Sequence, residues 1–367
     1  MVVNEDRFFL SHRKTIAQKA LEEGIDVTII CKDTGHADEV TALGFPMINL
    51  PINPTGTNLM EEMVTLFFLW KLYRKEKPDI VHHVGLKNIL WGGLAAKFTR
   101  IHHVVNAVCG LGVLFAGERL SFKARAVMKV FAWSSAGMNV SEIFQNKEDM
   151  QLFQAHGVVK KSQCDFIKGS GVDLDAFRYV PEPVEGKIRV IFTARMVKEK
   201  GVLTLIDAAE KLRSEFYDKV EFLLCGDLSS NPDGIRKEEL EARCDNTYIH
   251  WVGYRSDVLE LLKSSHIMAF PSYYREGVPL SLIEACAVGR PIVTCNSIGC
   301  RDVVDDGVNG FLVSPRDCDA LAEKLHELFL NKKLREQMGR NGRERAEREF
   351  SIQKVVEKHL EIYNRSF

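Results

Sequence analysis

A strand–loop–helix–strand pattern near residue 280 constrains the fold of this chain more than any other stretch. The apolar run Ile267–Phe270 predicts a strand, and Pro279 predicts the first turn of a helix that ends at Gly289. A second apolar run, Pro291–Thr294, predicts the next strand. Short strands joined through helices form parallel sheets, so we expect a doubly wound α/β domain that binds its ligand at the carboxyl ends of the strands.

Two glutamates lie at this predicted junction. Glu276 lies in the loop at the mouth of the sheet, and Glu284 lies about a turn and a half into the helix. The N-terminus of a helix favours an anionic group such as a phosphate, and ionised carboxylates accept hydrogen bonds from hydroxyl groups. A ligand that carries both phosphate and hydroxyl groups fits this pattern. On spacing alone, ordinary solvated or capping glutamates fit it equally well.

The composition narrows the class of protein. A length of 367 residues predicts two domains, and 46% apolar with 27% charged residues is typical of a soluble globular protein. The net charge of −1 gives no general basicity for nucleic acid. Nine cysteines without a Cys-x-x-Cys pair indicate reduced thiols in a cytoplasmic protein. Charged residues at 5–7 argue against a signal peptide, and the longest uncharged run, 101–117, is too polar to span a membrane.

Apolar runs alternate with helical patterns along both halves of the chain. In the first half we expect a helix that Ser11 caps and that runs to Glu23. Strands are expected there at Val2–Val3, Val27–Cys31, Met47–Leu50, Pro78–His82 and Val104–Val105. A stretch near 167–183 with little periodicity is the predicted linker. A second series of strands follows at Ile188–Phe192, Val220–Cys225, Tyr248–Val252, Ile267–Phe270, Pro291–Thr294 and Gly310–Val313, and the last helix spans Ile352–Tyr363.

Basic residues follow the first strand of the second series. Arg195 comes directly after a buried run, and Lys200 lies five residues further along. A guanidinium binds phosphate with two donors and a lysine adds a compact charge, so the two can neutralise a diphosphate without a metal. A solvated basic loop is the alternative, and it applies better to Lys198 than to Arg195.

Glycines end two other strands of this series. Gly226 and Gly253 allow a flat base to approach the backbone, and Arg255 is placed to stack on it, although tight turns need the same residues. Asp173 and Asp175 have the spacing of a metal-binding pair but lie in the linker, where turn and capping chemistry explains them better. The sequence therefore predicts no metal site.

A basic and apolar helix is expected after Gly112. Its cations and its large apolar residues alternate: Arg119, Lys123, Arg125, Lys129, Phe122, Val127, Phe131, Trp133. Such a helix fits a membrane surface that bears anionic lipids. An ordinary surface helix with one core face fits equally well.

The combined motifs resemble those of glycosyltransferase family 4. They are Arg195-x4-Lys200-Gly201, Val252-Gly-Tyr-Arg-Ser-Asp257, Pro271-Ser272, Glu276-Gly-Val-Pro-x4-Glu284, Gly289-x-Pro291 and Asp306-Gly-x-Asn-Gly310. The resemblance implies the GT-B fold, which is two Rossmann-like domains that face each other across a cleft. It also implies an N-terminal acceptor domain at 1–170, a nucleotide-sugar domain at 171–350, and a helix at 351–367 that crosses back to the first domain.

The first half is similar to a narrower group, the bacterial transferases that extend undecaprenyl-diphosphate-linked sugars, such as N-acetylgalactosaminyltransferases. The matching segments are Pro78-Asp-Ile, Lys87, Leu94-Ala-Ala-Lys97 and Gly110-Leu-Gly112. Two features depart from the family. The glycine-rich loop after the first strand is replaced by residues 4–13, and no histidine near Asn106 takes the usual place beside the sugar.

Roles for individual residues follow from the resemblance. Arg195 and Lys200 are expected to hold the donor diphosphate, and Glu284 to bind the ribose. Glu276 is expected to contact the hydroxyls of the donor sugar and the reacting centre, where Gly277–Val278 offers backbone N–H groups.

The predicted function is therefore a retaining, metal-independent transfer of a hexose or N-acetylhexosamine. The donor is a UDP-sugar, and the acceptor is a polyprenyl-diphosphate-linked saccharide of a bacterial surface glycan such as capsule or lipopolysaccharide. No cofactor and no nucleic acid are expected, and Lys87 is a candidate for the acceptor phosphates. The predicted location is the inner face of the cytoplasmic membrane. A UDP-sugar epimerase of the same fold and an inactive nucleotide-sugar-binding protein are the alternatives, although the complete set of four charged residues favours the transferase.

Overall fold

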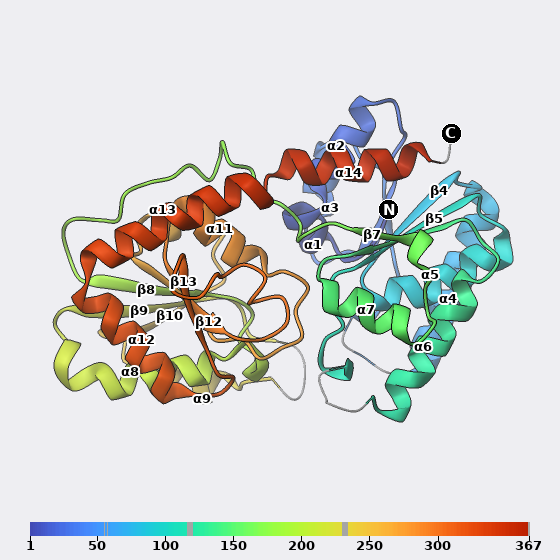
Figure 1. Cartoon of the computed structure of the whole chain (residues 1–367). Coiled ribbons are helices and arrows are strands. Elements are labelled where there is room, and N and C mark those ends of the chain that lie inside the picture. Colours follow the sequence, from blue (N-terminus) through green and yellow to red (C-terminus); the bar gives the residue numbers. More distant parts are fainter. Residues whose placement is uncertain (55, 57, 116–119, 230–233, 366–367) are drawn as a thin grey trace. The chain divides into compact units, whose positions relative to one another are not determined.

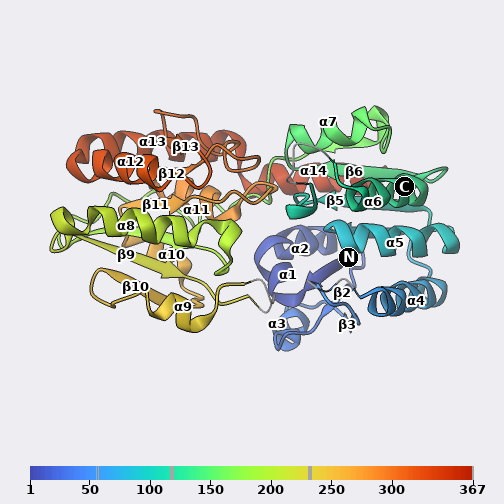
Figure 2. The same ribbon diagram turned by 90° about the horizontal axis from the view of Figure 1, so that it is seen from below.

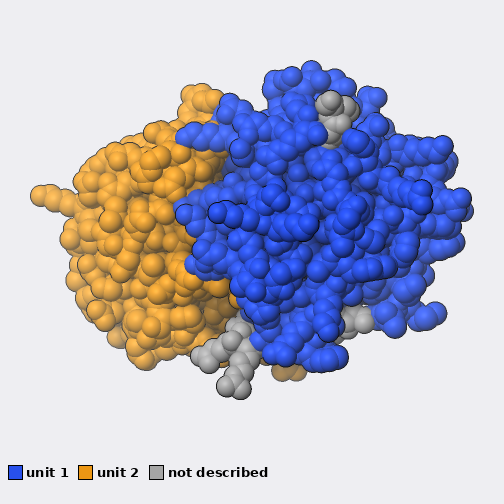
Figure 3. All heavy atoms as spheres, turned by 45° about the vertical axis from the view of Figure 1, so that its right-hand side comes forward, with its two compact units in different colours: residues 1–171, 352–367 blue, residues 172–351 orange. Residues whose placement is uncertain are grey.

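The structure is a computed structural model that describes residues 1–54, 56, 58–115, 120–229 and 234–365. The chain divides into two compact units (Figure 3). Unit 1 comprises Met1–Gly171 with Ile352–Phe367, and unit 2 comprises Val172–Ser351. Among the described residues, no helix has both the length and the apolar character to cross a membrane.

Unit 1 is built on a parallel sheet of seven strands in the order β3-β2-β1-β4-β5-β6-β7. Their bounds are β1 Val2–Glu5, β2 Ile29–Lys32, β3 Met47–Asn49, β4 Ile80–Val84, β5 His103–Val108, β6 Val140–Phe144 and β7 Cys164–Phe166. The strand order reverses between β1 and β4. Ligands of doubly wound sheets bind at such a point, outside the carboxyl ends of the strands.

Helices cover both faces of this sheet (Figures 1 and 2). The helices of unit 1 are α1 Asp6–His12, α2 Lys14–Glu22, α3 Ala37–Ala42, α4 Leu59–Glu76, α5 Leu86–Thr99, α6 Phe122–Ser135, α7 Lys147–Ala155 and α14 Ile352–Asn364. Val3 packs with α1, α2 and α14, whereas Val2 packs with α4 and α5. Successive side chains of a strand point to opposite faces, so the two valines belong to separate cores.

The prediction that Ser11 caps the first helix is wrong. Helix α1 begins at Asp6, directly after β1, and Ser11 lies inside it, where its Oγ donates to the carbonyl of Arg7 at 2.8 Å. The buried carboxylate of Asp6 accepts hydrogen bonds from the backbone N–H of Thr34 at 2.7 Å and of His36 at 3.1 Å. Asp6 therefore ties the loop after β2 to the end of β1.

Strands β6 and β7 were not predicted, and in β6 the charged Glu142 interrupts the apolar pattern. Glu142 is fully buried, and its Oε1 accepts from Ser135 at 2.9 Å and from Asn106 at 3.2 Å. Burial raises the pKa of this carboxyl to about 7. Partners on α6 and β5 thus satisfy one oxygen of this buried acid, whereas its Oε2 has no hydrogen-bond partner among the described residues.

Unit 2 contains a parallel sheet of six strands in the order β10-β9-β8-β11-β12-β13. The bounds are β8 Ile188–Thr193, β9 Val220–Cys225, β10 Ile249–Gly253, β11 Ile267–Phe270, β12 Ile292–Cys295 and β13 Gly310–Val313. Each of the six was predicted from its apolar run to within one residue at each end. The strand order reverses between β8 and β11.

The helices of unit 2 connect and cover these strands. They are α8 Val202–Phe216, α9 Lys237–Glu241, α10 Val258–Lys263, α11 Leu280–Val288, α12 Cys318–Leu330 and α13 Lys332–Glu349, with a 3₁₀ turn at Lys198–Lys200. After α13 the chain returns to unit 1, where α14 packs against α2 (Figure 1). The hydroxyl of Tyr363 on α14 lies 2.6 Å from Nδ1 of His82 on β4, which anchors this helix to the sheet.

Candidate functional site

The predicted donor-binding residues lie beside the point in unit 2 where the strand order reverses. Arg195 and Lys200 follow β8, and Glu276 follows β11, which is the next strand in the sheet. Helices α8 and α11 begin at this same end of the sheet, directly after Gly201 and Pro279. Two helix N-termini and two cations therefore share one end of the sheet, which is an arrangement suited to an anionic ligand.

Lys200 and Glu276 are separated by 75 residues in the sequence but form an ion pair. The Nζ of Lys200 lies 2.6 Å from Oε1 of Glu276, and the same oxygen accepts a hydrogen bond from Oγ of Ser272 at 2.9 Å. Glu276 is 8% exposed and Ser272 is fully buried. The sequence assigned no role to Ser272; its place four residues before Glu276 in a loop was the available signal.

Two aromatic rings lie within cation–π distance of the Lys200 ammonium group. Its Nζ lies 5.5 Å from the ring centre of Phe270 and 5.3 Å from that of Tyr274. Burial raises the pKa of Tyr274, the charge of Glu276 raises it further, and Arg195 opposes both. Arg195 is therefore close enough to act on this ring. It is exposed, and its side chain makes no hydrogen bond or ion pair with any described residue.

Two glycines fix the backbone of this site. A Cβ on Gly201, which has φ +81°, would lie 2.0 Å from the carbonyl oxygen of Pro271. A Cβ on Gly299 would lie 2.2 Å from the carbonyl oxygen of Gly277 and 2.7 Å from Cβ of Glu276. Neither position tolerates a side chain, so the loops that carry Lys200 and Glu276 are held in close backbone contact.

Glu284 lies in the second turn of α11, as predicted. Pro279 precedes the first residue of this helix, and Gly289, with φ +84°, ends it. The Glu284 side chain is partly buried, and burial raises the pKa of its carboxyl to about 8. This shift favours the protonated form of Glu284.

The residues predicted to surround the base have other partners. Arg255 donates two hydrogen bonds to Asp257, from Nε at 2.7 Å and from Nη2 at 2.5 Å, which leaves the face of the guanidinium available for stacking. A Cβ on Gly226 would lie 1.8 Å from the carbonyl oxygen of Ala194, so this glycine is needed for contact between the ends of β8 and β9. Around Gly253 there is open space.

In unit 1, Lys87 has partners that the sequence did not predict, and its proposed role toward the acceptor stays a prediction. Lys87, the candidate for the acceptor phosphates, donates to Oε1 of Glu62 and to the carbonyl of Gly56, both at 2.5 Å, and to the carbonyl of Asn53 at 2.7 Å. The charge of Lys87 is therefore neutralised by Glu62 within unit 1. The basic helix is α6, on which Lys123, Arg125 and Lys129 are exposed, and Arg119 lies outside the described residues.

Asp173 forms a turn, as the sequence analysis predicted. Its Oδ1 accepts from the backbone N–H of Asp175 at 2.9 Å and of Ala176 at 3.1 Å. These contacts explain the spacing of the two aspartates without a metal.

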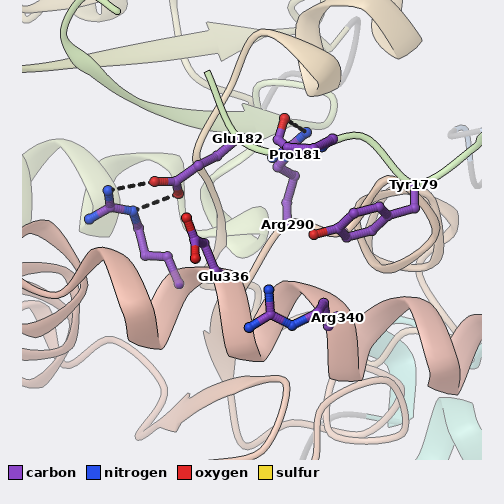
Figure 4. Close-up of a pocket in the computed structure, with 8 residues that line it drawn as sticks. Tyr179, Pro181, Glu182, Arg290, Glu336 and Arg340 are labelled. Carbon is purple, nitrogen blue, oxygen red and sulfur yellow. Dashed lines mark hydrogen bonds and ion pairs between the residues drawn. The ribbon is translucent and has the colours of Figure 1, made fainter. Parts of the chain in front are cut away.

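A separate pocket of 190 Å³ lies near the amino ends of the unit 2 strands, at the end of the sheet opposite the candidate site (Figure 4). Its charged side chains already have partners. Arg335 forms two hydrogen bonds of 2.8 Å with Glu182, and Arg290 donates to the carbonyls of Val180 at 2.7 Å and Leu262 at 3.1 Å. These contacts hold the start of unit 2 against α13, so we assign this pocket a structural role.

Comparisons with known protein families cover both units. A family model described as "Glycosyl transferases group 1" matches residues 175–345. A second, described as "Glycosyl transferase 4-like", matches residues 1–144.

Two curated relatives extend over nearly the whole chain. The N,N'-diacetylbacillosaminyl-diphospho-undecaprenol alpha-1,3-N-acetylgalactosaminyltransferase of Campylobacter jejuni is 27% identical over 363 residues, which is 95% of this chain and 93% of that protein. The UDP-Gal:alpha-D-GlcNAc-diphosphoundecaprenol alpha-1,3-galactosyltransferase of Escherichia coli is 28% identical over 361 residues, 93% of this chain and 89% of that protein.

Solved structures share the fold. Anabaena HepE in complex with UDP and glucose superposes with a TM-score of 0.79 at 16% identity, covering 99% of this chain and 98% of that one. A glycosyltransferase from Rickettsia africae superposes with a TM-score of 0.75 at 21% identity, covering 100% of this chain and 97% of that one.

Proposed function

Because this chain belongs to the group 1 glycosyl transferases and has the GT-B fold, we propose that it moves a sugar from a UDP-sugar to a polyprenyl-diphosphate-linked saccharide. The family and the fold inferred from the sequence motifs are thereby confirmed. The two relatives that match nearly the whole chain are named for undecaprenyl-diphosphate-linked acceptors, which supports this acceptor class here. A neighbour that holds UDP supports a uridine donor.

The observation that carries the proposal is the set of charges at the reversal of strand order in unit 2. Arg195 is exposed with no ionic partner among the described residues, and Lys200 lies beside it on the loop after β8. Both lie at the edge where α8 and α11 begin. A diphosphate bound there lies beside two positive side chains and two helix N-termini. These groups stabilise the negative charge that develops on the diphosphate as its bond to the sugar breaks.

Donor binding changes the partner of Lys200 in this scheme. In the free chain its charge is neutralised by Glu276 at 2.6 Å. When Lys200 binds the donor diphosphate, its ion pair with Glu276 is lost. The carboxylate of Glu276 can then accept hydrogen bonds from the sugar hydroxyls next to the reacting carbon. Ser272 keeps one oxygen of that carboxylate in place. The same exchange therefore binds the leaving group and orients the sugar.

The remaining features of the reaction follow from these roles. Glu284 binds the ribose hydroxyls, Gly277–Val278 contributes backbone N–H groups, and Arg255 stacks on the base. Cations from the protein replace a metal, and the acceptor hydroxyl attacks from the face that the diphosphate leaves, with retention of configuration. The lipid-linked acceptor is met at an anionic membrane surface, on the cytoplasmic side where nucleotide sugars are available.

The test is release of UDP from a panel of UDP-hexoses and UDP-N-acetylhexosamines with a polyprenyl-diphosphate-linked saccharide, in the presence of EDTA. The proposal expects UDP and an elongated, α-configured product with at least one donor, at a rate that EDTA leaves unchanged. A strict requirement for added Mg²⁺ or Mn²⁺ would refute the metal-free scheme. Absence of turnover with every donor would refute the proposed substrates.

A further inference from the structure

Helix α4 carries an apolar stripe that faces away from the core of unit 1. Its inward residues are Glu62, Thr65, Leu69 and Tyr73. The residues of the stripe are between 49% and 75% exposed: Leu59, Met60, Met63, Val64, Phe67. Soluble proteins rarely expose so many large apolar side chains together, and a contiguous patch of this kind marks an interaction surface.

The same face of α4 becomes basic in its second half. Lys71, Arg74 and Lys75 are exposed and continue the stripe at helical spacing from Phe67. Lys71 and Arg74 form no ion pair with any described residue. One helix therefore presents an apolar half followed by a cationic half in a single direction.

A hollow of about 690 Å³ adjoins the cationic half, between the C-terminal ends of α4 and α5. Three cations and two aromatic rings are among the residues that line it: Arg74, Lys77, Arg100, Trp70, Phe98. Asp79 contributes one carboxylate. The hollow thus has a net positive lining with apolar walls, which matches the chemistry of a phosphate-bearing headgroup.

Helix α5 packs between α4 and α6, so the three helices form one layer (Figure 2). Phe98 on α5 and Trp133 on α6 are both about half exposed and pack edge to face at 5.8 Å. Lys97 lies 5.5 Å from the ring centre of Trp133. Cations and large apolar groups thus extend from α4 across the layer to α6.

We propose that α4 is an in-plane membrane anchor whose apolar half enters the acyl region and whose cationic half, with the adjoining hollow, binds anionic phospholipid headgroups. The charge of this face distinguishes between its possible partners, an anionic bilayer and a second copy of the chain. A chain with a net charge of −1 places Lys71 and Arg74, which form no ion pair with a described residue, at the end of the exposed apolar stripe of α4, whereas Lys75 pairs with Glu76 at 2.7 Å. This combination favours an anionic bilayer over a second, equally basic copy of the same face. The inference rests on the proposed function, because it places the lipid-linked acceptor beside α4.

The test measures partition of the full chain onto phosphatidylcholine vesicles with and without phosphatidylglycerol. Met60→Ser with Phe67→Ser should weaken binding to the anionic vesicles at least ~10-fold, because both exposed side chains lose their contact with the acyl region. Lys71→Gln with Arg74→Gln should weaken it on the order of fivefold for each cation and should reduce the preference for phosphatidylglycerol.

Two control pairs make this test specific. Val184→Ser with Leu330→Ser removes comparably exposed apolar side chains from unit 2 and should leave binding unchanged. Lys123→Gln with Lys129→Gln reports on α6, the helix that the sequence indicated; a loss confined to this pair would overturn the assignment to α4. Wild-type partition by the α4 serine variant would overturn it as well. A wild-type dimer that this variant dissociates would show that the face binds a second copy instead.

Activity separates this inference from the proposed function. The α4 serine variant should lose turnover on a long-chain lipid acceptor and keep it on a short water-soluble analogue. Equal losses on both acceptors would overturn the anchor. If the wild-type chain used neither acceptor, the proposed function would fail, whereas vesicle partition would still decide the role of α4.

Discussion

The proposed role of Glu284 at the ribose predicts that donor affinity depends on pH. Partial burial raises the pKa of its carboxyl to about 8, and only the ionised form offers both oxygens purely as acceptors to the two ribose hydroxyls. Each pH unit below 8 therefore costs about 1.4 kcal/mol of binding free energy. The Kd of an intact UDP-sugar should rise about tenfold per unit below pH 8 and level off above it.

Isothermal titration with an intact UDP-sugar checks this prediction, because the diphosphate diester itself does not titrate in this range. Titrations in buffers of different ionisation enthalpy should show that donor binding releases a proton near pH 7. Glu284→Gln is the matched control, since it keeps the shape of the side chain and removes the titration. A flat pH profile in the wild type, or a slope that persists in the glutamine variant, would refute the ribose assignment.

Three further predictions concern named side chains. Arg195→Ala and Lys200→Ala should each lower kcat/KM by about 100-fold. Only Lys200→Ala should also lower Tm, because it leaves Glu276 buried without its cation. Normal kinetics in both variants would contradict the assignment of these residues to the diphosphate. Glu276→Ala should mainly reduce kcat and Glu284→Ala should mainly raise the donor KM, and the opposite pattern in steady-state kinetics would exchange their roles. Glu142, whose pKa in the folded chain is about 7 against an ordinary value of 4.5, contributes stability that is fully present below pH 4.5 and is lost as the pH rises through 7. Denaturant unfolding should show a loss of about 3 kcal/mol over this range, absent in Glu142→Gln; the same slope in both proteins would mean that another group titrates.

The strands of unit 2 were predictable because apolar side chains dominate each of them, even where Arg189, Glu221 and His250 interrupt the run. In unit 1 the same reasoning missed β6 and β7; in β6 the buried Glu142 interrupts the run and bonds to Ser135 and Asn106. It also failed at α1, where the buried carboxylate of Asp6 lets a helix begin without the expected serine cap. In both cases the deciding partner is distant in the sequence.

The candidate site was likewise predicted only in part. Motif spacing and the predicted strand ends identified Arg195, Lys200 and Glu276 as neighbours of one sheet edge. Spacing could not reveal that Lys200 and Glu276 neutralise each other, that Ser272 orients the carboxylate, or that Lys87 is already paired with Glu62. These contacts depend on loop conformations that local propensity does not determine.

The most direct test of the central claim is a single-turnover reaction with a radiolabelled UDP-sugar and a polyprenyl-diphosphate-linked saccharide. UDP and label in the lipid product would be quantified together for the wild type and for Glu276→Gln. The proposed function predicts that the wild type forms one UDP for each labelled lipid and that Glu276→Gln binds the donor but transfers the sugar far more slowly. Conversion of the donor sugar to an isomer without release of UDP, or release of UDP without label in the lipid, would contradict it.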